Sequence, residues 1–388
     1  MYKLILRIKK RIQLFINIRK GVPQIMKYVP NGVNRVTHIS AFSYANAGDT
    51  FLPVVLRDLF NKFIGVQTWY DYDVHKSIDA KAVNIFNNSD FIVIGGGGLF
   101  LADTCPNEVS GWQWNCSIDM LEQIKTPIIA FALGYNRFRG QQDFKPIFTE
   151  HVRKFVSKSV FVGIRNHGSI NKLSLYLEEA ERAKLRFQPC MTTLTSLIYP
   201  NFLDYTKKQD FIAINCAFDR KNLRSSNSNY LVSIARVVKE LSKITKIKVY
   251  SHLETDKEIL PYLDNQNIPY ELVELVHVKD ILRCYSAPRL VIGMRGHAQM
   301  IPFGCLTPIV SIISHDKMKW FLDDINHPEW GADVDDINFE SNLLRISIDA
   351  YSHYKDRIEN VKIAQSELWK ITIKNLKDIN NILNHLKK

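Results

Sequence analysis

The sequence predicts an α/β protein with two domains, each built on a mostly parallel sheet. Short apolar runs of strand length alternate with longer segments of helical periodicity, which is typical of βαβ units. The alternation stops at a polar stretch over residues 201–209 and then starts again. A chain of 388 residues is long enough for two separate cores. We therefore expect an N-terminal segment over residues 1–30, domains over 35–200 and 205–350, and a C-terminal helix over 354–388.

The pattern predicts four strands in the first domain: a first strand over residues 35–40, and apolar runs typical of buried strands over 90–94, 127–134 and 160–164. After the first run we expect a helix from about Thr50 to Phe60, with Asp49 as its N-cap or as an active-site group. Asp71 and Asp73 have the Asp-x-Asp spacing of metal-dependent transferases. The residues before them form a poor strand pattern, so we expect a surface turn there.

Five further runs predict the strands of the second domain, over residues 211–215, 247–251, 271–275, 289–294 and 307–313. Helical segments separate them, at about 230–244, 257–263, 278–285 and 298–305. A Lys-rich helical stretch from about Tyr354 to Leu386 ends the pattern and could pack across the domain junction.

The composition is that of a folded protein without a membrane span or a metal site. The chain has 46% hydrophobic residues and no apolar run long enough for a transmembrane helix, and its start lacks the features of a secretory signal. We therefore expect a cytoplasmic location. The six cysteines are scattered and the eleven histidines form no ligand motif, so we expect no protein-held metal.

The net charge of +12 predicts an acidic partner. Basic and apolar residues interleave over the first twenty positions, a pattern that fits peripheral contact with an anionic membrane. A basic helix packed on the protein's own core fits the same pattern, and both interpretations remain open. No recognisable nucleic-acid module accompanies the charge, so we expect no nucleic-acid partner.

Arg295, Gly296 and His297 follow a predicted strand and precede a predicted helix. In an open α/β sheet this position faces the ligand, so a guanidinium and an imidazole there form a candidate anion site. An ordinary ion pair for the arginine and a helix-start role for the histidine are the alternatives. Arg165 occupies a similar position after the strand over 160–164.

Gly95, Gly96, Gly97 and Gly98 follow the strand over 90–94. Four glycines permit close approach of a ligand or of a neighbouring backbone. The spacing matches neither the dinucleotide fingerprint nor a phosphate-binding Gly-Lys-Ser/Thr loop. Asp103 lies shortly after the glycines and could face the same cleft or belong to a surface turn.

Taken together and in this order, several motifs resemble the polysaccharide pyruvyl transferase family: residues 45–49, 95–100, 163–165 and 292–297. The resemblance spans roughly residues 40–325. It implies two Rossmann-like domains that face a cleft as in GT-B glycosyltransferases. It also implies transfer of a pyruvyl group from phosphoenolpyruvate to a sugar hydroxyl pair, as a ketal, during synthesis of bacterial surface polysaccharide. The sugar acceptor could be lipid-linked or nucleotide-linked.

By this resemblance Arg165, Arg295 and His297 contact phosphoenolpyruvate, and Gly95 to Gly98 form a loop in the cleft. Many members have a bulkier apolar residue where this chain has Gly296. Two guanidiniums suit a donor that carries a phosphate and a carboxylate, and no cofactor is implied. His297 is the expected proton donor, with Asp49 or Asp103 as the base.

Two other functions fit parts of the sequence. A GT-B glycosyltransferase that uses a nucleotide-sugar donor would have a similar two-domain cleft. A non-catalytic protein held at a membrane surface would account for the basic N-terminal segment.

Overall fold

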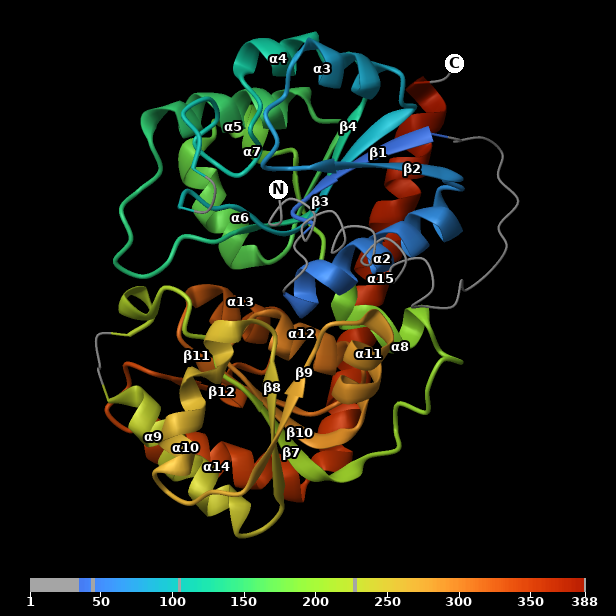
Figure 1. The fold of residues 1–388 in the computed structure, drawn as a ribbon. Helices are drawn as coiled ribbons and strands as arrows, with labels where there is room; N and C mark the ends of the chain where they lie inside the picture. Colours follow the sequence, from blue (N-terminus) through green and yellow to red (C-terminus); the bar gives the residue numbers. More distant parts are fainter. Residues whose placement is uncertain (1–34, 43–45, 104–105, 226–228, 387–388) are drawn as a thin grey trace, which may run out of the picture.

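A computed structural model of the chain describes residues 35–42, 46–103, 106–225 and 229–386 (Figure 1). The fold class is the one predicted: two six-stranded sheets flanked by helices, with parallel pairing throughout the strands described. The N-terminal segment predicted over residues 1–30 lies outside the described residues.

The first sheet has the strand order β2-β1-β3-β4-β5-β6. Its strands are β1 (Arg35–Ser40), β2 (Thr68–Asp73), β3 (Phe91–Phe100), β4 (Ile128–Tyr135), β5 (Phe161–Ile164) and β6 (Leu185–Phe187). The helices of this half are α2 (Ala47–Phe63), α3 (Ala80–Asn87), α4 (Ile118–Gln123), α5 (Pro146–Lys158), α6 (His167–Leu173), α7 (Glu179–Arg182) and α8 (Thr195–Ile198).

The second sheet has the strand order β12-β11-β10-β7-β8-β9, the arrangement of dinucleotide-binding folds. Its strands are β7 (Gln209–Asn215), β8 (Lys246–Ser251), β9 (Tyr270–Glu274), β10 (Pro288–Gly293), β11 (Ile309–Ile313) and β12 (Gly331–Asp333). The helices of this half are α9 (Tyr230–Ser242), α10 (Leu260–Asp264), α11 (Val278–Ser286), α12 (His297–Gly304), α13 (Asp316–Asp324) and α14 (Phe339–Ser352), and α15 (Tyr354–Leu386) follows them.

The strand orders locate the region where a ligand binds. In the first sheet the order reverses between β1 and β3, and in the second between β7 and β10. Loops on either side of such a reversal diverge and leave a crevice at the carboxyl ends of the strands. The segments that follow β1, β3, β7 and β10 are therefore the ones that should carry the site.

The two halves share one apolar cluster besides having clusters of their own. In it, Phe51 and Leu52 of α2 are buried in the same cluster as Ile281 of α11 and Ile301 of α12. Helix α15 contacts α2 of the first half and α14 of the second, and Figure 1 shows it running beside both sheets. This is the cross-junction packing that the sequence suggested. No helix in the described ranges is long and apolar enough to cross a bilayer.

Two local predictions are wrong. The expected surface turn at Asp71 and Asp73 is strand β2, which lies at the edge of the sheet with most of its residues partly or fully exposed. An edge strand needs no apolar alternation, so the sequence pattern did not reveal it. The four glycines are part of strand β3, which continues to Phe100. Pairing with β4 continues through them, so they are not a loop after the strand.

Candidate functional site

A cavity of about 350 Å³ lies between the two halves of the chain, at the crevices predicted by the strand orders. It is rich in positive charge. Five cationic side chains and two carboxylates line it, together with two histidines: Arg165, Arg220, Arg224, Arg295, Lys317, Asp49, Asp219, His75 and His297. An anionic ligand therefore fits the lining better than a neutral one.

The structure brings Arg165, Arg295 and His297 into this one cavity, as the sequence predicts. Arg165 follows β5, which ends at Ile164, and Arg295 follows β10, which ends at Gly293. His297 is the first residue of α12. Parallel strands deliver these side chains to the same edge of each sheet, and the two edges face each other.

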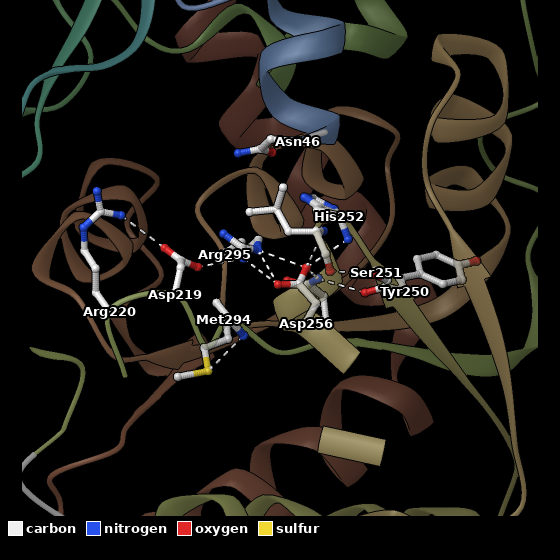
Figure 2. Close-up of polar contacts among 12 residues, drawn as sticks. Asn46, Asp219, Arg220, Tyr250, Ser251, His252, Asp256, Met294 and Arg295 are labelled. Atoms are coloured by element: carbon white, nitrogen blue, oxygen red, sulfur yellow. Dashed lines mark hydrogen bonds and ion pairs between the residues drawn. The ribbon is translucent and has the colours of Figure 1, made fainter. Parts of the chain in front are cut away.

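Arg295 pairs with two carboxylates (Figure 2). Its Nε donates to Asp256 Oδ1 at 2.9 Å, and its Nη2 pairs with Asp256 and, at 2.7 Å, with Asp219. Asp256 has no exposed surface and also accepts from the backbone N–H of His252 at 2.9 Å. Figure 2 shows Asp219 and Asp256 on opposite sides of the guanidinium. The positive charge of Arg295 is thus balanced within the protein.

Arg165 is in the opposite situation. It is 5% exposed, and its Nε and Nη2 have no hydrogen-bond partner among the described residues. An unpaired guanidinium in a buried position is costly, so Arg165 is a candidate for binding an anion.

The ring of His297 fits between a glycine of α2 and a cysteine. A Cβ atom on Gly48 would lie 1.9 Å from His297 Nδ1, and Cys190 Sγ lies 3.8 Å from Nε2. Burial lowers the pKa of His297 well below its ordinary value, and Arg165 adds to this effect. The imidazole is therefore neutral at pH 7.

Asp49 lines the cavity. The sequence predicted it as the N-cap of α2, and that prediction is wrong. Helix α2 begins at Ala47, and its N-cap is Asn46, whose side chain accepts from the N–H of Gly48 at 2.9 Å. Asp49 thereby lies in the first turn. Burial raises its pKa to about 6, against the opposing effect of Lys317 and Arg295.

The remaining predicted residues separate into two groups. Gly97, Gly98 and Gly296 line the cavity. Gly95 and Gly96 do not, because they pack against the backbone of Phe131 and the side chain of Leu52.

Asp103 is not part of the lining either. Its two oxygens accept from Arg220 at 2.6 and 2.7 Å, a contact that joins the two halves of the chain.

Sequence reasoning missed Lys317, Arg224 and Asn136. Asn136 directly follows β4, and Lys317 is the second residue of α13, the helix after β11. Lys317 Nζ donates to Asn136 Oδ1 at 2.8 Å, which joins the two sheets across the cavity. Burial lowers the pKa of Lys317 well below its ordinary value. Asn136 and Lys317 lie shortly after strand ends, which is the same signal that identified Arg165, whereas Arg224 follows a short 3-10 helix (Lys221–Leu223) and carries no such signal.

Comparison with solved structures shows the fold. A mutant O-GlcNAc transferase from Thermobaculum terrenum has a TM-score of 0.50 and 10% identity, over 97% of this chain and 73% of that one. A putative UDP-N-acetylglucosamine 2-epimerase from Listeria monocytogenes has a TM-score of 0.50 and 12% identity, over 86% and 91%. The chain spans 54% of the length of a mutant TarM from S. aureus, with a TM-score of 0.47 and 12% identity over 69% of this chain.

Sequence comparison is more specific. No curated protein sequence matches the chain significantly. The family model described as polysaccharide pyruvyl transferase matches residues 42–316, which is well over half of the chain and includes every predicted site residue. The chain belongs to the polysaccharide pyruvyl transferase family.

Proposed function

We propose that this protein transfers a pyruvyl group from phosphoenolpyruvate to two hydroxyls of a sugar, forming a ketal during synthesis of a surface polysaccharide. The observation that carries the proposal is the buried guanidinium of Arg165, whose Nε and Nη2 have no partner among the described residues and which lines a cation-rich cavity. Phosphoenolpyruvate brings a phosphate and a carboxylate to such a site. Membership of the family supports the reaction type.

The reaction balances without a change of oxidation state, so it needs no redox cofactor. A proton is added to the methylene carbon of phosphoenolpyruvate, and the neighbouring carbon becomes electron-poor. One sugar hydroxyl attacks that carbon and loses its proton. The bond between that carbon and the phosphate oxygen then breaks. The second hydroxyl attacks the same carbon and completes the ketal, and its proton leaves with the inorganic phosphate.

The electrostatics favour Asp49 as the proton donor and His297 as the acceptor of the hydroxyl proton, the reverse of the roles expected from the sequence. A carboxyl with a pKa of about 6 retains a useful protonated fraction near neutral pH. The negative charge of the bound donor would raise that pKa further. A neutral imidazole is the form that can accept a proton.

The dependence of the Tm on added ligand separates this proposal from the alternative, a GT-B glycosyltransferase that uses a nucleotide-sugar donor. Phosphoenolpyruvate at a concentration well above its Kd should raise the Tm, whereas a glycosyltransferase that uses only a nucleotide-sugar donor should show no such shift with phosphoenolpyruvate. The ketal product should then be identified by mass spectrometry of a sugar acceptor, tested both free and as a nucleotide or lipid conjugate, with release of inorganic phosphate measured in parallel. Consumption of a nucleotide sugar without phosphoenolpyruvate would instead support a GT-B glycosyltransferase.

A further inference from the structure

His38 is a buried histidine whose two ring nitrogens both have hydrogen-bond partners. It lies in β1 with no exposed surface, and it is not among the described residues that line the cavity. Arg57 Nε, from α2, donates to His38 Nδ1 at 3.1 Å. On the other side of the ring, Nε2 lies 2.9 Å from the carbonyl oxygen of Gly95 in β3. The imidazole therefore joins three elements of the first half.

The guanidinium of Arg57 determines which nitrogen of His38 carries the proton. Arginine has only donors, so Nδ1 is the acceptor of that contact. The proton of a neutral ring is then on Nε2, the nitrogen that faces the carbonyl of Gly95 and donates to it. Burial lowers the pKa of His38 well below its ordinary value, and Arg57 adds to this effect, so the ring stays neutral.

Asp71 and two aromatic rings hold Arg57 in place. Asp71 of β2 pairs with Arg57 Nη2, and it lies beside His38 in the register of the two strands. The guanidinium also lies 5.5 Å from the ring centre of Trp69 and 5.6 Å from that of Phe42. The first aspartate of the Asp-x-Asp spacing is thus part of an ion pair that fixes Arg57.

The carbonyl of Gly95 lies where β3 stops being regular. Pairing of β3 with β1 extends to Ile94. Gly96 and Gly97 then have positive φ values of 36° and 97°, and the register with β4 shifts after Gly97. Buried backbone that leaves a ladder needs another partner for its polar groups, and His38 supplies one here.

The glycines after this point reach the cavity. Gly97 and Gly98 line it. A Cβ atom on Gly98 would lie 2.9 Å from Asn136 Cγ, so the backbone of Gly98 is in close contact with that side chain. Asn136 in turn accepts from Lys317 across the cavity. A shift of the glycine backbone would therefore move Asn136 and change the shape of the cavity wall.

We propose that His38 is a positioning residue of the cavity: its Nε2–H holds the carbonyl of Gly95 and thereby fixes the glycine backbone that lines the cavity. Arg57 and Asp71 keep His38 in the tautomer that donates. None of these three side chains is among the described residues that line the cavity, so they act through the backbone and not by contact with a ligand. The inference rests on the proposed function only for the ligand used in one of its tests.

Hydrogen exchange of the ligand-free full chain, followed by mass spectrometry, tests whether His38 holds the glycines. His38→Met removes the donor, whereas His38→Gln has the same length and keeps an N–H donor near the position of Nε2. Exchange in peptides covering residues 96–100 should be about 10- to 100-fold faster in His38→Met, because a buried carbonyl has lost its partner. His38→Gln should exchange there like the wild type, and peptides from β10 should be unchanged in both variants.

Isothermal titration with phosphoenolpyruvate tests the consequence for the site. His38→Met should raise the Kd by about 10-fold, because the cavity wall is displaced, while His38→Gln should bind like the wild type. A merely structural role would lower the fraction of molecules that bind and leave the Kd of the folded molecules unchanged. The titration measures the binding stoichiometry and the Kd separately.

The ¹⁵N NMR signals of the His38 ring, assigned by their absence in His38→Gln, give a third readout. The wild type should show a protonated Nε2 and an unprotonated Nδ1, and Arg57→Met should lose this preference. A ring protonated on Nδ1 in the wild type would overturn the inference. Wild-type exchange rates or a wild-type Kd in His38→Met would also overturn it. Absence of phosphoenolpyruvate binding by the wild type would overturn the proposed function instead, and the exchange rates would still decide whether His38 holds the glycine backbone.

Discussion

Gly48 and His297 lie against each other across the junction between the two halves. A Cβ atom on Gly48 would be 1.9 Å from Nδ1 of the imidazole and 2.4 Å from Cγ, so the ring occupies the space that a side chain would fill. The start of α2 thus determines where the first residue of α12 can place its ring.

Gly48→Ala is expected to displace His297 and lower turnover at least tenfold. Alanine would otherwise stabilise a helix relative to glycine by about 1 kcal/mol. A decrease in Tm, instead of the increase that this propensity predicts, would report the clash. Gly140→Ala is the control for turnover: a Cβ there meets nothing within 4 Å, so the variant should lose stability through the positive φ of 69° alone and retain turnover. If Gly48→Ala is as active as the wild type, the contact has no catalytic importance.

Asp49→Asn should abolish turnover and stabilise the protein above pH 6. The folded pKa is about 6 and the ordinary value is 3.8, so folding favours the protonated form. That contribution is fully present below pH 3.8 and is lost as the pH rises through 6. The loss amounts to about 3 kcal/mol, and the asparagine variant avoids it. Urea unfolding of both proteins between pH 4 and 8 measures the difference.

Asp58→Asn is a matched control for this experiment. Burial also raises the pKa of Asp58 to about 6, and its carboxylate accepts from Tyr199 Oη at 2.6 Å. It does not line the cavity. The variant should show a similar dependence of stability on pH with turnover retained. Equal turnover in the two variants would remove Asp49 from the reaction.

Arg295→Ala should destabilise the fold by about 3–5 kcal/mol, because it leaves the carboxylate of Asp256 buried without its cation. Combining it with Asp256→Asn should recover a large part of that loss. The free energy of unfolding in urea measures both effects. If Arg295→Ala alone has wild-type stability, the ion pair between Arg295 and Asp256 does not stabilise this part of the site.

Arg139→Ala should loosen the contact between the two halves. Arg139 follows β4, and it donates to Asp316 at 2.8 Å and to Asp333 at 2.7 Å on the second half. We expect a loss of about 1–2 kcal/mol in the free energy of unfolding, smaller at high salt, and a higher KM for the donor. The control is Lys145→Ala, which removes an exposed ion pair with Glu108 and should cost less than 1 kcal/mol.

The sequence by itself determined the elements that are buried on both faces. The run over residues 127–134 became β4, because a short continuous apolar segment suits a strand of a parallel sheet that is covered on both faces. The sequence also located Arg165, Arg295 and His297, since residues after a parallel strand face the ligand edge. The sequence did not predict strand β2, because a strand at the exposed edge of a sheet needs no apolar pattern.

Only the tertiary structure decided which charges remain available to a ligand. Arg295 is 39 residues from Asp256, and Lys317 is 181 residues from Asn136, so neither contact is visible as a local pattern. An arginine or lysine is available to an anionic ligand only if it is not already paired with a carboxylate of the folded protein. Such contacts between distant segments form only in the folded chain. Among the described residues they pair Arg295 with Asp256 and leave Arg165 and Lys317 without a carboxylate partner.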